Sequence, residues 1–340
     1  MTHELIRIFE AYSKAQSKQL KTVLATVVDL EGSSYRRPGV RMLLIENGEM
    51  IGAVSGGCVE KEVFKQSESV FSSSIPKVMT YDGRYRLGCE GLLYILLEPF
   101  KPSDELIQTF NGHIGLRNSF KLHSYFVREE QTNATMKTLI EFNDSKTFPL
   151  SGVDIIEATS NKLIDFSQEM KPRFQLLILG GEHDAVALCK LGAGIGWEVT
   201  VVVSPKSSKS MKRFPGARRV LALTPEELKS LEMDTQTAVV LMTHNYASDL
   251  NLLLQLIDIN LLYIGILGPA KRKEKLLGDL MDFEMNLCEE FIDSIHGPAG
   301  INVGAETPEE ISISILAEIL AVHRNQKPLS LRNKKTGIHS

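Results

Sequence analysis

Five short apolar runs, separated by helical stretches, constrain the second half of this chain more than any other feature. The runs are QLLIL, EVTVVV, VLAL, TAVVLMT and LLYIGIL, and they lie between residues 175 and 267. Continuous apolar runs of this length are typical of strands that are buried on both faces of a parallel sheet. Strands that alternate with helices form a doubly wound α/β sheet. We therefore expect such a domain at residues 174–330.

The first half of the chain has a mixed pattern of helices and strands. Apolar spacing and β-branched content predict helices at 3–20 and 58–71, and strands at 22–29, 41–46, 50–54, 76–82 and 92–98. Asn47-Gly48 predicts a hairpin with a type I′ turn. We expect an α+β domain over residues 1–166, with a variable middle segment.

Polar segments and helix caps delimit these regions. SQEMKPR at 167–173 carries Pro172 and is the expected linker, and residues 331–340 are the expected tail. Thr-Pro-Glu-Glu occurs twice, beginning at Thr224 and at Thr307. Each places Thr at the N-cap, Pro at the first helical position and Glu at the third, so a helix is predicted after each.

Charge balance and cysteine usage exclude several classes of protein. Lys and Arg number 38 and Asp and Glu 42, and the net charge of −4 gives no electrostatic footprint for nucleic acid or an anionic membrane. No apolar run approaches the ~20 residues that span a bilayer. Cys58, Cys89, Cys189 and Cys288 form no CxxC pair, and we expect no secretory signal because the first residues have no apolar core. We expect reduced thiols in a cytoplasmic protein.

A glycine turn follows the first strand of the second half, where a dinucleotide-binding fingerprint belongs. In LLILGGEHDA, Gly180 and Gly181 begin the turn, and Glu182 stands where a second fingerprint glycine normally admits pyrophosphate. Ser204 ends the next strand, so no carboxylate is placed to bind a ribose hydroxyl. Both departures argue against NAD(P). Either a nucleotide or pterin phosphate binds at the helix N-terminus beside His183, or the turn serves packing alone.

Other polar loops fall at the carboxyl edge of the predicted sheet, where ligands bind in doubly wound folds. Thr243, His244 and Asn245 follow the fourth strand, and His296 and Gly297 precede the last helix. Histidines and an amide at one edge favour recognition of a polar ligand, and glycine permits close backbone approach. Gly-Pro pairs are also ordinary turn residues, so a structural role is the alternative.

Glycine-rich loops of the first half carry cysteines. Gly56 and Gly57 precede Cys58 and Glu60 at the start of a predicted helix. Cys89 lies in the sequence Gly-Cys-Glu-Gly, so it also has glycines on both sides. A thiol in the first turn of a helix is shifted toward thiolate by the helix dipole. Such a thiol can contact a metal or carry sulfur, and the alternative is a small buried side chain.

Paired arginines lie in the loop before the predicted strand at 41–46. Arg36 and Arg37 follow hydroxyl residues in GSSYRRPG, and guanidinium groups match the geometry of phosphate. This loop is either an anion site or a solvated basic loop.

Together these motifs resemble the XdhC/CoxI family, the xanthine dehydrogenase accessory proteins. In the first half the resemblance rests on GSSYRRPGVRMLL, GAVSGGCVEKEV and LGCEGLLYILLEP. In the second half it rests on LLILGGEHDAVALCKLGAGIGWEVTVVV, VVLMTHNYASD, YIGILGPAKRKEKL and HGPAGINVGAETPEEISISILAEILAV. Several motifs in the family's order are more specific than a single glycine turn.

The resemblance implies an N-terminal XdhC/CoxI domain and a C-terminal Rossmann-like domain. It implies a dimeric accessory chaperone, rather than a turnover enzyme, that binds molybdenum cofactor (molybdopterin) transiently. A cysteine desulfurase would supply sulfur to that cofactor, and a xanthine dehydrogenase-like hydroxylase would receive it. On this interpretation Arg36 and Arg37 take the phosphate, and Cys58 contacts molybdenum or accepts sulfur.

The sequence also departs from the family's pattern at three positions, Glu90, Glu182 and Ser204. A changed ligand is therefore an open possibility. The alternatives are an NAD(P)-dependent oxidoreductase and a ligand-free adaptor, both built on the Rossmann-like half.

Overall fold

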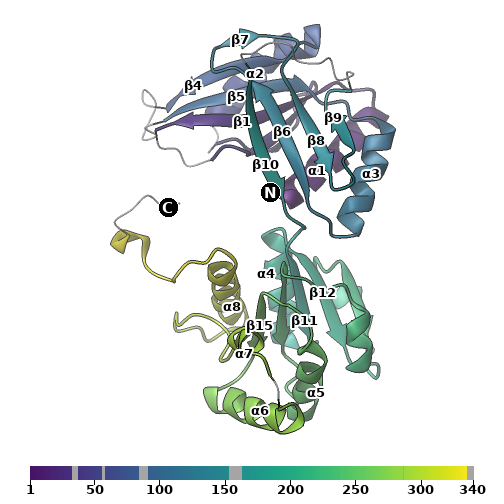
Figure 1. Cartoon of the computed structure of the whole chain (residues 1–340), viewed down its shortest axis with the longest axis vertical. Helices are drawn as coiled ribbons and strands as arrows, with labels where there is room; N and C mark the ends of the chain where they lie inside the picture. Colours follow the sequence, from purple (N-terminus) through teal and green to yellow (C-terminus); the bar gives the residue numbers. More distant parts are fainter. Residues whose placement is uncertain (33–36, 56–57, 84–90, 153–162, 286, 335–340) are drawn as a thin grey trace. The chain divides into compact units, whose positions relative to one another are not determined.

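The computed structural model describes every residue except 33–36, 56–57, 84–90, 153–162, 286 and 335–340. Its contacts divide the chain into two compact units, Met1–Pro172 and Arg173–Ser340. Both units mix helices with sheets (Figure 1), and the second contains the predicted parallel sheet.

Two antiparallel sheets build the first unit. One has the strand order β3-β2-β1-β5-β4-β7, and the other has the order β10-β6-β8-β9. The strands of the first sheet are β1 (Thr22–Glu31), β2 (Arg41–Ile45), β3 (Met50–Gly52), β4 (Lys77–Asp82), β5 (Leu92–Pro99) and β7 (Gln131–Thr132). Those of the second are β6 (Phe120–Phe126), β8 (Lys137–Phe142), β9 (Thr147–Pro149) and β10 (Ile164–Met170).

Three helices cover these sheets, namely α1 (Thr2–Ser17), α2 (Cys58–Ser73) and α3 (Asp104–Gly115). The buried valines of α2 pack on one face of the first sheet. Helices α1 and α3 pack on its other face together with the second sheet. There the rings of Phe9 and Phe110 stack with their centroids 4.1 Å apart. The segment between β5 and β10, which contains α3, β6, β8 and β9, therefore supplies part of this unit's core.

The hairpin of β2 and β3 is confirmed, but its predicted type I′ turn is wrong. Three residues separate Ile45 from Glu49, whose carbonyl accepts the Ile45 N–H at 2.9 Å. Gly48 has a φ of +94°, whereas Asn47 does not adopt a positive φ. This geometry is that of a three-residue loop with a glycine bulge. The Asn47 side chain instead accepts the Glu49 N–H at 3.1 Å.

The second unit is the predicted doubly wound sheet. Its strands are all parallel and have the order β13-β12-β11-β14-β15-β16. They are β11 (Gln175–Leu179), β12 (Glu198–Val203), β13 (Arg219–Ala222), β14 (Thr237–Leu241), β15 (Tyr263–Ile266) and β16 (Ile295–His296). The helices are α4 (His183–Gly194), α5 (Tyr246–Leu256), α6 (Ala270–Phe283), α7 (Glu289–Asp293) and α8 (Pro308–His323). Helices α4 and α8 cover one face, and α5 and α6 cover the other.

One of the two predicted capping boxes starts an α-helix. Thr307 accepts the Glu310 N–H and begins α8, as predicted. After Thr224 the chain forms only a short 3₁₀ helix, η3 (Glu226–Ser230). Half of that box is present, because the Thr224 N–H donates to Glu227 Oε2 at 2.8 Å. The prediction of an α-helix there was wrong.

The expected linker at 167–173 also needs correction. Residues 167–170 belong to β10, which pairs with β6 along its whole length. β10 lies at the edge of its sheet, and from Asp165 onward exposed residues alternate with more buried ones, as the two faces of a strand require. Its polar composition therefore reflects an exposed edge strand rather than a connection between units.

Candidate functional site

Four of the residues proposed from the sequence line one pocket in the second unit. Gly180, Gly181, Thr243 and Asn245 surround a cavity of about 390 Å³ at the carboxyl ends of β11, β12 and β14. Its other lining residues include Glu182, Ser204, Ser207, Lys209, Leu223 and Leu252. β12 lies on one side of β11 and β14 on the other, so the strand order reverses at β11. In doubly wound sheets, ligands bind at such a topological switch point.

Steric contacts account for both glycines of the turn. Gly180 has a φ of +137°, and a Cβ there would overlap the carbonyl oxygen of Met242. A Cβ on Gly181 would lie 2.9 Å from side-chain carbons of Lys209 and Val203. Packing therefore requires glycine at the first position, whether or not a ligand approaches this turn.

Lys209 is a pocket residue that sequence reasoning missed. Its ammonium group forms an ion pair with Glu182, the N-cap residue of α4. This hydrogen bond holds the pKa of Glu182 below its ordinary value, and the charges of Arg213 and His244 act in the same direction. The carboxylate at the second fingerprint position is thus neutralised by a partner from another loop. The signal in the sequence was the run of cations that follows β12.

A buried carboxylate organises the loop after β14. Asp249 is only 1% exposed and accepts hydrogen bonds from Thr243 Oγ1 at 2.5 Å and from Arg272 Nη2 at 2.7 Å. The Asn245 side chain caps α5 by accepting the Ser248 N–H at 2.9 Å. These contacts fix the loop on the rim of the pocket.

The histidines lie apart from the pocket lining. His183 is exposed at the start of α4, and His244 lies 3.5 Å from the Asp184 carboxylate. His296 stacks on Tyr263 with the ring centroids 4.4 Å apart.

A partly buried carboxylate, Glu318 of α8, anchors the His296 segment. Its oxygens lie 3.7 Å from His296 Nδ1 and accept the Tyr263 hydroxyl at 2.6 Å and the Gly300 N–H at 2.7 Å. Burial raises the pKa of Glu318, but these hydrogen bonds outweigh burial and hold the pKa below its ordinary value. The cluster joins α8 to β15 and β16. Gly297 lies against the Lys273 side chain, away from the pocket lining.

Several proposed residues of the first unit lie outside the described residues, namely Arg36, Gly56, Gly57 and Cys89. Arg37 is exposed, and Cys58 begins the 16-residue helix α2. Glu60 is 7% exposed and accepts the Ser55 N–H at 2.7 Å and the Ser55 hydroxyl at 3.2 Å. The Glu60 carboxylate thus anchors Ser55 at the end of the β3 segment.

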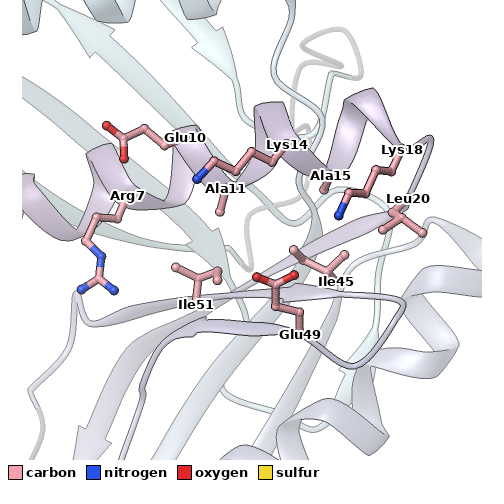
Figure 2. Close-up of a pocket in the computed structure, with 10 residues that line it drawn as sticks. All are labelled: Arg7, Glu10, Ala11, Lys14, Ala15, Lys18, Leu20, Ile45, Glu49 and Ile51. Carbon is pink, nitrogen blue, oxygen red and sulfur yellow. The ribbon is translucent and has the colours of Figure 1, made fainter.

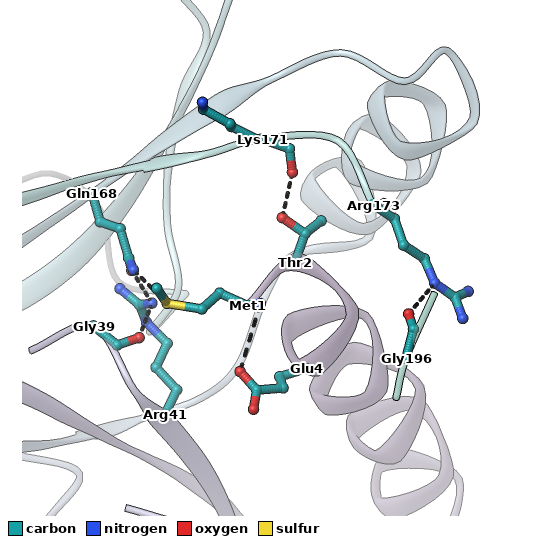
Figure 3. Close-up of polar contacts among 9 residues, drawn as sticks. All are labelled: Met1, Thr2, Glu4, Gly39, Arg41, Gln168, Lys171, Arg173 and Gly196. Atoms are coloured by element: carbon teal, nitrogen blue, oxygen red, sulfur yellow. Dashed lines mark hydrogen bonds and ion pairs between the residues drawn. The ribbon is translucent and has the colours of Figure 1, made fainter. Parts of the chain in front are cut away.

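Arg41, close in sequence to the paired arginines, is directed into the interior (Figure 3). Its Nη1 donates to the carbonyl of Gly39 at 2.8 Å and to Gln168 Oε1 at 2.5 Å. Burial lowers the pKa of Arg41 to about 10, and the charges of Glu98 and Glu4 oppose that effect. Arg41 therefore links Gly39 to Gln168 of β10 inside the first unit and is not part of an exposed anion site.

A second hollow of about 240 Å³ lies between α1 and the β2–β3 hairpin. Figure 2 shows Ile45 and Ile51 facing α1, with the charged side chains of Arg7, Lys18 and Glu49 around them. None of the residues proposed from the sequence lines it.

The described residues lack two kinds of feature. No group of three or more His, Cys, Asp or Glu side chains there is arranged to hold a metal ion. None of the helices in that part of the chain is long and apolar enough to cross a membrane.

Comparison with known proteins identifies the family. A model of the XdhC and CoxI family matches residues 15–82, and a model of the XdhC Rossmann domain matches residues 176–319. A probable xanthine dehydrogenase subunit of Bacillus subtilis (strain 168) is 29% identical over 324 residues, which cover 90% of this chain and 94% of that protein. The molybdenum cofactor insertion chaperone PaoD of Escherichia coli (strain K12) is 24% identical over 315 residues, which cover 90% of this chain and 84% of that protein.

A solved structure shares the fold. It is described as a xanthine dehydrogenase from Bacillus halodurans, and it matches with a TM-score of 0.76 and 24% identity over 96% of this chain and 98% of its own. Both family models match in the order that the sequence motifs predict. The chain therefore belongs to the XdhC/CoxI family.

Proposed function

We propose that this protein is an accessory chaperone that binds molybdenum cofactor and delivers it to a xanthine dehydrogenase-like hydroxylase. One observation carries the proposal: the relative named as a molybdenum cofactor insertion chaperone aligns with 90% of this chain. A maturation factor needs to hold and release its cargo rather than turn over a substrate. The cofactor is therefore cargo, and the protein acts through binding.

Cys58 is the residue that we assign to the metal end of the cargo. It lies in the first turn of α2, where the helix dipole favours a thiolate, and thiolates are soft metal ligands. The negative charge of Glu60, in the same helical turn, opposes a thiolate, so this role requires the helix dipole to outweigh it. During sulfuration by a cysteine desulfurase, Cys58 would either contact molybdenum or accept sulfur.

The phosphate of the cargo is assigned to the loop that holds Arg36 and Arg37. A guanidinium group forms paired hydrogen bonds with a phosphate, and Arg37 is exposed to solvent, where a ligand can reach it. Gly56 and Gly57 are proposed to bind the same cofactor, and Cys89 is proposed as a second candidate thiol. The candidate residues of the second unit stay predictions as cofactor-binding residues, namely Gly180, Gly181, His183, Thr243, His244, Asn245, His296 and Gly297.

The proposed setting is a cytoplasmic homodimer that meets both the desulfurase and the hydroxylase. Four scattered cysteines without a CxxC pair favour a reducing compartment. NAD(P) has no part in the proposed role.

Cofactor transfer in a defined mixture tests this function. The chain, loaded with molybdenum cofactor under anaerobic conditions, is mixed with cofactor-free hydroxylase, cysteine desulfurase and cysteine. We expect more hydroxylase activity than the same amount of free cofactor produces. Equal activity with free cofactor would overturn the chaperone proposal.

A cysteine pair then tests the assignment of Cys58. Cys58→Ala should lose most of the activation, whereas Cys288→Ala, which removes an exposed thiol from the second unit, should retain it. Full activation by the Cys58 variant would remove this thiol from the mechanism and leave the family assignment intact.

A further inference from the structure

The pocket of the second unit has the size and lining of a small-molecule site. Its volume of about 390 Å³ lies near the lower end of the range for such sites, roughly 300–1,000 Å³. Leu223 and Leu252 provide apolar wall, and Ser204, Ser207 and Asn245 provide hydrogen-bonding groups. A ligand of mononucleotide size, with a flat ring against the leucines, matches this lining.

The end of β12 favours an anion. Sheets that bind dinucleotides commonly carry a carboxylate at this position, where it accepts hydrogen bonds from ribose hydroxyls and repels a phosphate. Ser204 stands there instead, and residues 204–225 contain no carboxylate. The part of this segment that directly follows β12 carries four cations, which are Lys206, Lys209, Lys212 and Arg213, and Lys209 lines the pocket. In a chain with a net charge of −4, this local concentration of cations is unusual.

The glycine turn, in contrast, disfavours a pyrophosphate. The Lys209 side chain lies against Gly181, and its ammonium group pairs with Glu182 above the N-terminus of α4. A pyrophosphate at this turn would have to displace Lys209 and approach the Glu182 carboxylate. The ion pair thus closes the position that dinucleotides normally use.

We propose that this pocket binds a ribonucleoside that carries a phosphomonoester on the 2′-oxygen of its ribose, and that Glu182 excludes dinucleotides. Hydroxyl groups of Ser204 and Ser207 donate to the phosphate, and the Lys209 ammonium, which keeps Glu182 as a partner, donates a further hydrogen bond to it. The base lies against Leu223 and Leu252. This site is independent of the proposed cargo site in the first unit, so either proposal can fail without the other.

Calorimetric titration of the full chain tests the ligand class. The probes are adenosine 2′-phosphate, guanosine 2′-phosphate, adenosine, inorganic phosphate and NAD⁺. We expect at least one nucleoside phosphate to bind more tightly than adenosine, inorganic phosphate and NAD⁺. The proposal is overturned if neither nucleoside phosphate binds. It is also overturned if inorganic phosphate binds equally well, because the pocket would then be a simple anion site.

Two variants test the residues. Lys209→Met should weaken binding of the nucleoside phosphate by about tenfold or more, because a charge-assisted hydrogen bond is lost, while binding of adenosine stays unchanged. Lys190→Met, which removes an exposed lysine further along α4, is the matched control. Glu182→Gln should strengthen NAD⁺ binding. Equal losses in both lysine variants, or unchanged NAD⁺ binding in Glu182→Gln, would contradict the assigned roles.

Discussion

Glu98 of β5 offers a quantitative test of how the first unit is held together. Its side chain is fully buried and accepts the Thr138 N–H of β8 at 2.7 Å, so it joins the two antiparallel sheets. Burial raises the pKa of Glu98 to about 7, although hydrogen bonds from Thr138 and the charge of Arg41 oppose the rise. Substitution of Glu98 by glutamine replaces this carboxyl with a neutral group of the same shape.

The expected effect follows from the two pKa values. The ordinary pKa of this carboxyl is 4.5 and the folded value is about 7, so folding favours the protonated form. The stability that the protonated Glu98 side chain contributes is fully present below pH 4.5 and is lost as the pH rises through 7. A difference of about 2.5 pH units, at about 1.4 kcal/mol each, corresponds to about 3 kcal/mol. The glutamine side chain of the variant does not titrate, and its amide oxygen can still accept the Thr138 N–H.

Urea denaturation between pH 5 and pH 8, followed by far-UV circular dichroism, measures this effect. Relative to the unsubstituted protein, the free energy of unfolding of Glu98→Gln should rise by about 2.5 kcal/mol across that range. Trp197 is the one tryptophan and lies in the second unit, so its fluorescence is an internal control that should not change. A free-energy difference that is independent of pH would refute the reasoning.

Three further substitutions probe the second unit, each by urea denaturation followed through Trp197 fluorescence. Gly180→Ala should lower the free energy of unfolding by at least about 2 kcal/mol, because the residue has a positive φ and a Cβ there would overlap a backbone carbonyl. The control Gly194→Ala, whose Cβ meets open space, should not lower it. Equal effects of the two substitutions would disprove the steric argument. Asp249→Ala should cost about 3 kcal/mol, since two hydrogen-bond donors lose a buried acceptor, and a loss below about 0.5 kcal/mol would show that the network is dispensable. Thr307→Ala should cost about 1 kcal/mol through loss of the N-cap of α8, and an unchanged denaturation midpoint would argue against that cap.

The sheet of the second unit was predictable because buried parallel strands are continuous apolar runs. Strands β11 to β15 all coincide with such runs. Strand β16 was missed because it contains two residues, too few for any periodicity. The edge strand β10 was mistaken for part of a linker, since its exposed residues carry no apolar signal. Apolar patterns thus reveal the central strands and the apolar edge strand β13, but not edge strands that are polar or very short.

The site was predictable to a smaller extent. Gly180 and Asn245 were placed together because the carboxyl ends of parallel strands meet at one edge of a sheet. The pairing of Lys209 with Glu182 was missed, because it depends on how two loops approach in space. His296 was expected to face a ligand, but its contact with Glu318 depends on the docking of α8, which no local pattern specifies.

The most direct test of the central claim is the ligand content of the protein. It should be expressed in a host that makes molybdenum cofactor and purified anaerobically under reducing conditions. Molybdenum and the fluorescence of oxidised pterin are then assayed in the same sample. A carrier of this cofactor should contain both, in stoichiometric amounts with the chain. A well-folded protein that contains neither, and accepts none when the cofactor is supplied, would contradict the proposal.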